Sequence, residues 1–211
     1  MTLYSYIVRW DGGFAPNPFF GHCTLACCKA GIRRKAKKGD WIVGLTPKAK
    51  GKGNKIVYFM EVEEILPFDE YWGAARFKVK RPRMDAGIVE KNGDNIYQPS
   101  KEYGDGFHQL PSVHSEPKFG KTENLKTKKK DLKGERVLVS RNFAYFGSEA
   151  LRLPRALDGL KIGVGYRCHF STNVQEAFRH FVGKQKLGVH GSPHLWPEND
   201  KSWRGSGCAA T

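Results

Sequence analysis

The chain has 211 residues, of which 12% are aromatic, and a formal net charge of +15 from 36 lysines and arginines against 21 acidic residues. This length suits one large domain with a sizeable core, and so many aromatic residues exclude a chain that is disordered throughout. No apolar run approaches the roughly 18 residues of a membrane-spanning helix, and no strongly amphipathic basic helix of the kind that lies on bilayers is present. The charge therefore favours nucleic acid over a membrane as the polyanionic partner.

The first predicted element is a strand over Tyr4–Trp10. No positively charged region precedes its apolar residues and no cleavage site follows them, so we expect no secretory signal peptide. The five cysteines, at positions 23, 27, 28, 168 and 208, are odd in number and two of them are adjacent, which suits free thiols better than a disulfide framework. We therefore expect a protein of the reducing cytoplasm.

The next segments alternate between helix and strand. Thr24 is placed to cap a helix that runs from about Leu25 to Lys37 and ends at Gly39. Two strands are predicted after it: a buried one at Trp41–Leu45, and a longer one at Ile56–Ile65 whose second half alternates between apolar and polar residues.

The second half of the chain contains a weakly patterned segment. Residues 84–134 are rich in Gly, Pro, Asn and Lys, and they are predicted to form a long, loop-rich insertion. Two β-rich runs follow within 136–147, and 173–182 has the apolar spacing of a helix. These elements favour an α+β fold, with a small mixed, curved sheet or pseudo-barrel flanked by short helices. We expect one domain over residues 1–195 and a flexible tail over 196–211.

Positive charge is concentrated in three blocks, at 29–55, 76–83 and 118–136. If the fold gathers them on one face, their lysines and arginines are suited to contact a nucleic-acid backbone; the alternative is three solvated loops. The residues expected to contact phosphates are Lys29, Arg33, Arg34, Arg76, Lys80 and Arg81.

A second set of residues is suited to holding a base. An aspartate or asparagine can read a base edge, aromatic rings can stack on a base, and a histidine in a glycine-rich loop can donate or accept near neutral pH. Turn-forming roles for the polar members, and core packing for most rings, are the structural alternatives. The candidates are Asp11, Asn17, Trp72, Phe146 and His190.

The cysteines at 23–28 allow two kinds of chemistry. Cys23, Cys27 and Cys28 are weak candidates for a zinc site, because one pair of them is adjacent rather than spaced. The Cys28 thiol has basic residues nearby that favour a thiolate, but the sequence places no histidine or acid next to it. The alternative is small buried thiols in a core, so we expect no metal. Neither a dinucleotide-binding nor a phosphate-binding glycine motif occurs, so we expect no cofactor.

Several phrases resemble one known family. They include DGGFAPNPF at 11–19, CTLACCK at 23–29 and GDWIVG at 39–44, with later matches in VSRNFAYFG at 139–147 and GVHGSP at 188–193. Together they resemble the nucleotide-modification-associated domain family, type 2, over about residues 3–195. The family is associated with bacterial and phage systems that handle modified DNA bases. The turn at Gly39 and the strand after it are also similar to PUA-like folds, including the EVE and ASCH domains, by analogy of fold alone.

Three functions are consistent with these features. The first is a DNA-binding domain that recognises a modified or flipped base in an aromatic pocket beside a basic surface. The second is an enzyme on the same substrate, a glycosylase or base-modifying transferase, in which Asp11 or His190 acts as general base. The third is an RNA-associated factor, because single-stranded RNA is also read by stacking.

Overall fold

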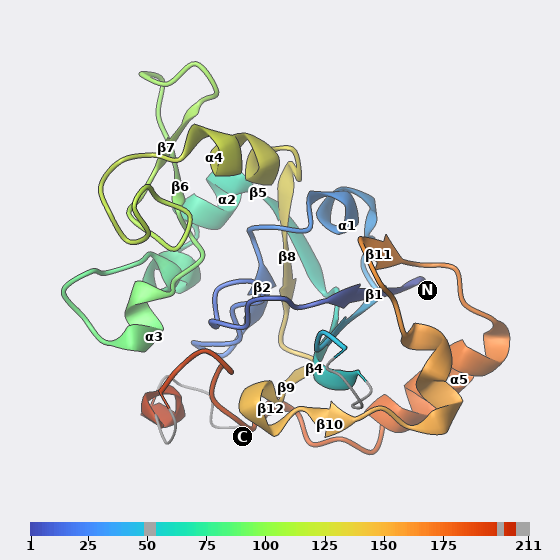
Figure 1. Ribbon diagram of the computed structural model, residues 1–211. Helices are drawn as coiled ribbons and strands as arrows, with labels where there is room; N and C mark the ends of the chain where they lie inside the picture. Colours follow the sequence, from blue (N-terminus) through green and yellow to red (C-terminus); the bar gives the residue numbers. More distant parts are fainter. Residues whose placement is uncertain (49–53, 198–200, 206–211) are drawn as a thin grey trace.

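A seven-stranded mixed sheet forms the centre of the computed structural model, which describes residues 1–48, 54–197 and 201–205 (Figure 1). Strand β1 pairs in parallel with β3, and β4 pairs in antiparallel fashion with both β3 and β9. Along the sheet the strands are β11 (Tyr166–Arg167), β1 (Leu3–Ile7), β3 (Trp41–Leu45), β4 (Lys55–Glu61), β9 (Phe143–Tyr145) and β12 (Gly188–Val189), and β10 (Leu151–Arg152) pairs with β4.

Both faces of this sheet are buried. In β4, Phe59 points into a cluster with Leu160 and Phe178, whereas Tyr58 and Met60 belong to the cluster on the other face. Helix α5 (Thr172–Val182) and the 3-10 helix η3 (Arg155–Leu160) supply the first cluster, and they lie together at the right of Figure 1. The apolar spacing that predicted a helix at 173–182 therefore marks the face that packs on the sheet.

A second, three-stranded sheet has the order β2 (Cys23–Leu25), β8 (Arg136–Ser140) and β5 (Glu64–Pro67). Two of the connections between the sheets are short ones, from β4 to β5 and from β8 to β9. The Glu63 carboxylate accepts hydrogen bonds from the backbone N–H groups of Arg141 and Asn142, which joins the two crossings. The predicted strand at Ile56–Ile65 is therefore two strands in different sheets.

The helix predicted at 25–37 is shorter than expected. Leu25 ends β2, and α1 spans only Ala30–Lys35. The cause lies in Cys28 and Lys29, whose φ angles of 57° and 41° fall in the left-handed region and prevent the helix from extending toward the N-terminus. Thr24 is a buried strand residue whose hydroxyl donates to Asp94 at 2.7 Å, so it is not the helix cap.

The insertion between β5 and β8 contains several short elements. They are α2 (Phe68–Gly73), the 3-10 helix η1 (Ala75–Lys80), α3 (Ile88–Lys91), β6 (Tyr97–Pro99), β7 (Phe107–Gln109) and α4 (Leu125–Leu132). They gather at the left of Figure 1, on the opposite side of the molecule from α5. Their core includes Phe68, Tyr71 and Tyr97, which pack with Val137 of β8. Much of the segment predicted as loop-rich is thus packed on the second sheet.

The α+β class predicted from the sequence is confirmed, and no sheet among the described residues closes into a barrel. No helix in the described ranges is long and apolar enough to cross a membrane. The tail predicted to be flexible contains two buried tryptophans, Trp196 and Trp203, which cluster with Phe19 and Val89. Residues 198–200 and 206–211 of that tail, including Cys208, lie outside the described ranges.

Candidate active site

A pocket of about 1120 Å³ lies between the end of β1, the start of α1 and the insertion. Its walls are mostly apolar and aromatic, which is typical of small-molecule sites. Five aromatic residues contribute to the lining: Tyr6, Trp10, Phe14, Phe119 and Trp196. Trp10 is 75% exposed, so its ring is not packed in the core and is available to a ligand.

The lining of the pocket is also positively charged. Arg9, Lys29, Lys91 and Lys118 face it, against one acidic residue, Glu116. The Lys118 ammonium lies 5.8 Å from the centroid of the Trp10 ring. An aromatic wall beside clustered cations suits a ligand that carries both a planar ring and an anionic group.

Cys28 and His114 meet in the wall of this pocket. The Cys28 Sγ atom lies 3.6 Å from His114 Nε2, and both residues contribute to the lining. Cys28 comes from the left-handed turn before α1, and His114 comes from the loop between β7 and α4. Phe14 packs edge-on against the imidazole at 4.8 Å and fixes one face of that ring.

Asp131, on α4, holds the other side of the imidazole. Its Oδ2 lies 2.6 Å from His114 Nδ1 and also accepts a hydrogen bond from the Tyr97 hydroxyl at 2.8 Å. Its Oδ1 accepts from the Cys28 backbone N–H at 2.6 Å. The carboxylate therefore orients the ring, so that Nε2 is directed at the sulfur, and it ties the turn at Cys28 to α4.

His114 and Asp131 each stabilise the charged form of the other. Burial alone would lower the pKa of His114, but the hydrogen bonds to Asp131 and Cys28 outweigh it and raise that pKa to about 10. Burial alone would raise the pKa of Asp131, but His114 and Arg33 reverse the effect and lower it. At neutral pH the pair is an imidazolium and a carboxylate. The Cys28 sulfur therefore lies 3.6 Å from a cationic proton donor.

Arg33 clamps the two loops that carry the cluster. Its guanidinium is fully buried and donates to the backbone carbonyls of Cys28 at 2.8 Å, Asp131 at 2.5 Å and Arg136 at 2.8 Å. A Cβ atom at Gly134 would lie 2.2 Å from the guanidinium carbon, so only glycine fits there. This clamp fixes the left-handed turn at Cys28 against α4.

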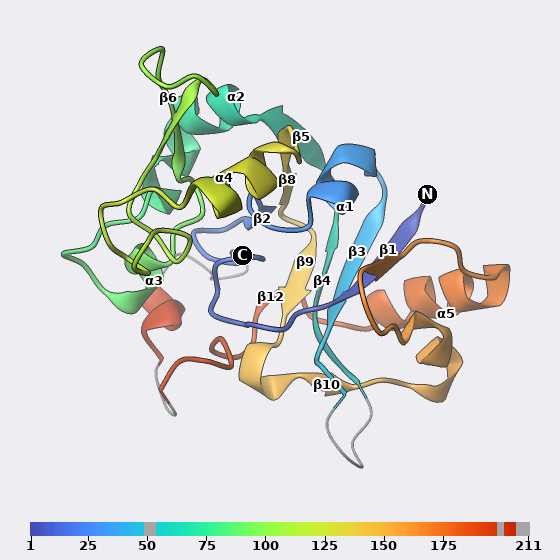
Figure 2. The same cartoon turned by 45° about the horizontal axis from the view of Figure 1, so that its top comes forward.

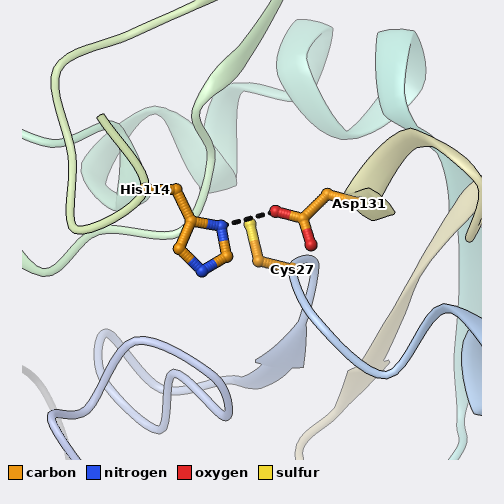
Figure 3. Close-up of side chains that lie close together, drawn as sticks. All are labelled: Cys27, His114 and Asp131. Carbon is orange, nitrogen blue, oxygen red and sulfur yellow. Dashed lines mark hydrogen bonds and ion pairs between the residues drawn. The ribbon is translucent and has the colours of Figure 1, made fainter. Parts of the chain in front are cut away.

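Cys27 lies on the opposite, closed side of the same cluster. One donor atom each of Cys27, His114 and Asp131 lie within 4.8 Å of one another, and Figure 3 shows the three side chains converging. The buried Cys27 thiol donates to the Asp94 carbonyl at 3.7 Å, and burial raises its pKa well above the usual value. A metal there requires the Cys27 thiolate and competes for the Nδ1 atom that Asp131 holds. The geometry therefore suits proton transfer between Cys28 and His114 better than metal binding.

The residues predicted to hold a base lie elsewhere. Asp11 is buried, and its carboxylate accepts from the Tyr145 hydroxyl and, at 3.1 Å, from the His194 backbone N–H. Burial raises the pKa of Asp11. Asn17 is fully buried, and its amide donates to the carbonyls of Gly13 and Asn92.

The three remaining candidates are engaged by neighbours of their own. Trp72 lies under the Arg81 guanidinium, 3.7 Å from the ring centroid. Phe146 is buried and stacks on the His190 ring at 5.1 Å, and His190 Nε2 lies 2.7 Å from the Lys186 carbonyl. None of the five predicted base-contact residues lines the described pocket.

The predicted phosphate contacts divide into accessible and buried groups. Lys29 lines the pocket and Arg34 is exposed on α1. Arg33 is the buried clamp described above, and the Lys80 ammonium is buried against Asn17 Oδ1 at 2.5 Å. Arg76 forms a 2.6 Å ion pair with Glu64. Arg81 contacts the Trp72 ring as described.

The basic residues near Cys28 indicated a thiolate, but the sequence did not predict His114 and Asp131 as its partners. His114 and Asp131 lie 86 and 103 residues away along the chain, within the segment predicted to be loops. No local spacing connects them to Cys28, because the insertion must fold before they meet. Cys23, another weak zinc candidate, is buried in β2 and is not part of the group in Figure 3.

The fold and the site together define an α+β protein with a cysteine and a histidine in contact at the wall of a pocket, and an aspartate bound to the far side of the histidine. The chain matches the family described as nucleotide modification associated domain 2 over residues 1–200, and it belongs to that family. The resemblance predicted from its sequence phrases is thereby confirmed. Comparisons with curated proteins and with solved structures found no match. Family membership gives this protein a role related to nucleotide modification.

Proposed function

We propose that this protein is a cysteine-dependent enzyme of nucleotide modification. Cys28 is the nucleophile, His114 carries the proton, and Asp131 positions the imidazole. The observation that carries the proposal is the bridging position of His114, with Nε2 at 3.6 Å from the sulfur and Nδ1 at 2.6 Å from the carboxylate. A nucleophile, a base and a third group that orients the base form the general pattern of covalent catalysis.

The lining of the pocket supports a nucleotide, or an exposed base of a nucleic acid, as the substrate. Trp10 and Phe119 lie at the pocket with exposed ring surface, and base stacking on such rings contributes about 1–3 kcal/mol per base. The four lining cations are suited to neutralise phosphate. A reader without catalysis is the second candidate, because the exposed Trp10 ring would bind a base whether or not chemistry follows.

Cations beside the pocket support a polymeric nucleic acid. Helix α1 packs against α4, and the two lie side by side in Figure 2. The exposed basic residues on and directly after these helices are Arg34, Lys35, Lys37, Lys38, Lys126, Lys129, Lys130 and Lys133. Because the same two helices adjoin Cys28 and carry Asp131, a backbone held by these cations would run next to the reactive thiol.

Cys28 is expected to be the thiol that iodoacetamide alkylates first at neutral pH. His114 Nε2 lies 3.6 Å from the Cys28 sulfur and can exchange a proton with it, so His114→Gln should slow the alkylation of Cys28 by about tenfold or more. The measurement is peptide mass spectrometry after timed labelling. Cys168, which is also partly exposed, provides the control: Cys168→Ser should leave the labelling of Cys28 unchanged.

Two results would count against this proposal. One is equal labelling of Cys28 and Cys168 in the native protein. The other is stoichiometric zinc in the purified protein, with Cys28 labelled only after a chelator is added, which would mean that the cluster is a metal site.

Trp10→Ala is expected to weaken the binding of a single-stranded oligonucleotide roughly 5- to 150-fold, from the loss of about 1–3 kcal/mol of stacking. Trp72→Ala is the matched control, because Trp72 does not line the described pocket. Fluorescence anisotropy at one fixed salt concentration measures both variants, with DNA and RNA oligonucleotides compared. If Trp72→Ala causes the larger loss, the base lies where the sequence predicted it instead.

The same assay separates the enzyme from the reader. Cys28→Ala removes the nucleophile but leaves the aromatic and cationic walls in place. In an enzyme it should retain binding and abolish any change in substrate mass, whereas a reader gives no change in mass with either protein.

A further inference from the structure

We infer that the reaction at Cys28 is acyl transfer through a thioester intermediate, an inference that rests on the proposed function. The substrate class is an acyl group carried as an ester, thioester or amide by an anionic carrier of nucleotide size. The observations behind this inference are the place of the His114 proton relative to the sulfur, the size of the pocket, and the separation of its apolar and cationic linings.

The first step needs a proton beside the leaving group, and His114 is placed to give it. The Cys28 sulfur attacks the carbonyl carbon as a thiolate, and its electron pair forms the S–C bond. The bond from that carbon to the carrier breaks, and the carrier leaves with the electron pair of the broken bond and the proton from His114 Nε2. The products are an acyl thioester on Cys28, a neutral imidazole and the protonated carrier, so atoms and charges balance.

The second step reverses the proton's path. An amine or hydroxyl group of the nucleotide substrate attacks the thioester carbonyl and passes its proton to His114. The new C–N or C–O bond forms, the S–C bond breaks, and the sulfur leaves as a thiolate next to the restored imidazolium. Water in place of that group gives hydrolysis. Asp131 keeps Nε2 directed at the sulfur in both steps by holding Nδ1 at 2.6 Å.

The position of the His114 proton favours a carbonyl carbon as the atom that the sulfur attacks, rather than an unsaturated ring carbon of a base. His114 Nε2 lies 3.6 Å from the sulfur, next to whatever is bonded to the atom that the sulfur attacks. In acyl transfer, that neighbouring atom is the leaving group, which needs the proton. When a thiolate adds to a base ring, the negative charge develops at other ring positions and at exocyclic oxygens, which lie farther from the attacking sulfur.

The pocket has room for both an acyl donor and an acceptor. Its volume of about 1120 Å³ exceeds the roughly 300–1000 Å³ of most small-molecule sites. Val113, Phe119 and Leu195 give it apolar surface that suits an acyl chain, while Lys29 and Lys91 suit an anionic carrier. The Lys29 ammonium donates to the Ile7 carbonyl at 3.2 Å and lies 4.3 Å from the Tyr6 ring centroid, which fixes this cation in the pocket wall.

The experiment uses two acetyl esters as probes, p-nitrophenyl acetate and phenyl acetate, with the full-length protein. The expected result is rapid release of one equivalent of p-nitrophenolate, one acetyl group on the Cys28 peptide by mass spectrometry, and its discharge when an arylamine is added. Cys28→Ala should abolish the acetylation, whereas Cys168→Ser should leave it unchanged.

His114→Gln distinguishes a relay from a thiol that is merely reactive. Phenolate needs a proton on leaving more than p-nitrophenolate does, so the variant should lose more rate with phenyl acetate, by about 10²–10⁴-fold for a general acid. A structural role for His114 would slow both esters equally. Far-ultraviolet circular dichroism of each variant checks that the fold is retained.

The outcomes separate this inference from the proposed function. If iodoacetamide labels Cys28 selectively and with dependence on His114, but neither ester acetylates it, or the loss in His114→Gln is equal for both esters, acyl transfer is wrong and the proposed function stands. If Cys28 shows neither selective labelling nor acetylation, both are wrong.

Discussion

Lys80→Met is expected to lower the free energy of unfolding by about 3–5 kcal/mol, the loss typical of breaking a buried ionic network by removing one partner. The Lys80 ammonium is fully buried and donates to Asn17 Oδ1 at 2.5 Å, to the Asn17 carbonyl at 3.1 Å and to the His22 carbonyl at 2.9 Å. It also offsets the raised pKa that burial gives Asp94. Methionine fills much of the same volume, so the loss would come from acceptors left unpaired.

The measurement for this prediction is urea denaturation, with the midpoint and the slope reported separately. Lys78→Met, at an exposed position of the same 3-10 helix η1, is the matched control and should change stability by less than about 0.5 kcal/mol, as most surface substitutions do. Equal stability of the two variants would contradict the structural role. A loss of oligonucleotide binding without a loss of stability would support the phosphate contact that the sequence predicted for Lys80.

The protein is expected to become less stable as the pH rises from about 7 to about 10, and His114→Gln should remove that dependence. In the folded protein the pKa of His114 is raised from its usual 6.5 to about 10. Burial alone would lower this pKa, but the contacts with Asp131 and Cys28 outweigh burial. Such a group contributes stability that is fully present below the unfolded pKa, because the folded protein holds the proton more tightly. The contribution is lost as pH rises through the folded pKa, with a slope of about 1.4 kcal/mol per pH unit for one proton.

Urea midpoints of the native protein and of His114→Gln, measured at intervals across this pH range, test the expectation. His169→Gln, which changes an exposed histidine, should retain the native slope. Asp131 has the opposite dependence, since its pKa is lowered and its contribution is lost as pH falls through the acidic range. A native slope that survives in His114→Gln would mean that the imidazole is not the group that holds the proton.

Local patterns in the sequence predicted the elements whose packing is local. The buried strand at 41–45 and the amphipathic helix at 173–182 both appear, because apolar spacing reports which face of an element meets the core. The bend at Val62 and Glu63 was not predictable, since the strand pattern continues through it. What turns the chain there is the contact of Glu63 with backbone groups of Arg141 and Asn142, which follow much later in the sequence.

The residues that form the candidate site were not predicted as a group. Composition indicated aromatic rings beside cations, and the pocket has both. Which rings are open to a ligand depends on tertiary packing: Trp10 is exposed at the pocket, whereas Phe146 is covered. His114 and Asp131 follow no motif relative to Cys28, and the left-handed φ angles at Cys28 and Lys29 are found at residues that local propensity would place in a helix.

The cluster is assembled from two distant stretches of chain, the turn before α1 and the insertion that ends in α4. A newly synthesised polypeptide therefore carries Cys28 for some time before its imidazole and carboxylate partners emerge and dock. During that interval the Cys28 sulfur lacks the contact with His114 on which the proposed reactivity depends. In the proposed enzyme, thiol reactivity at Cys28 would therefore report that the insertion has folded against the turn before α1.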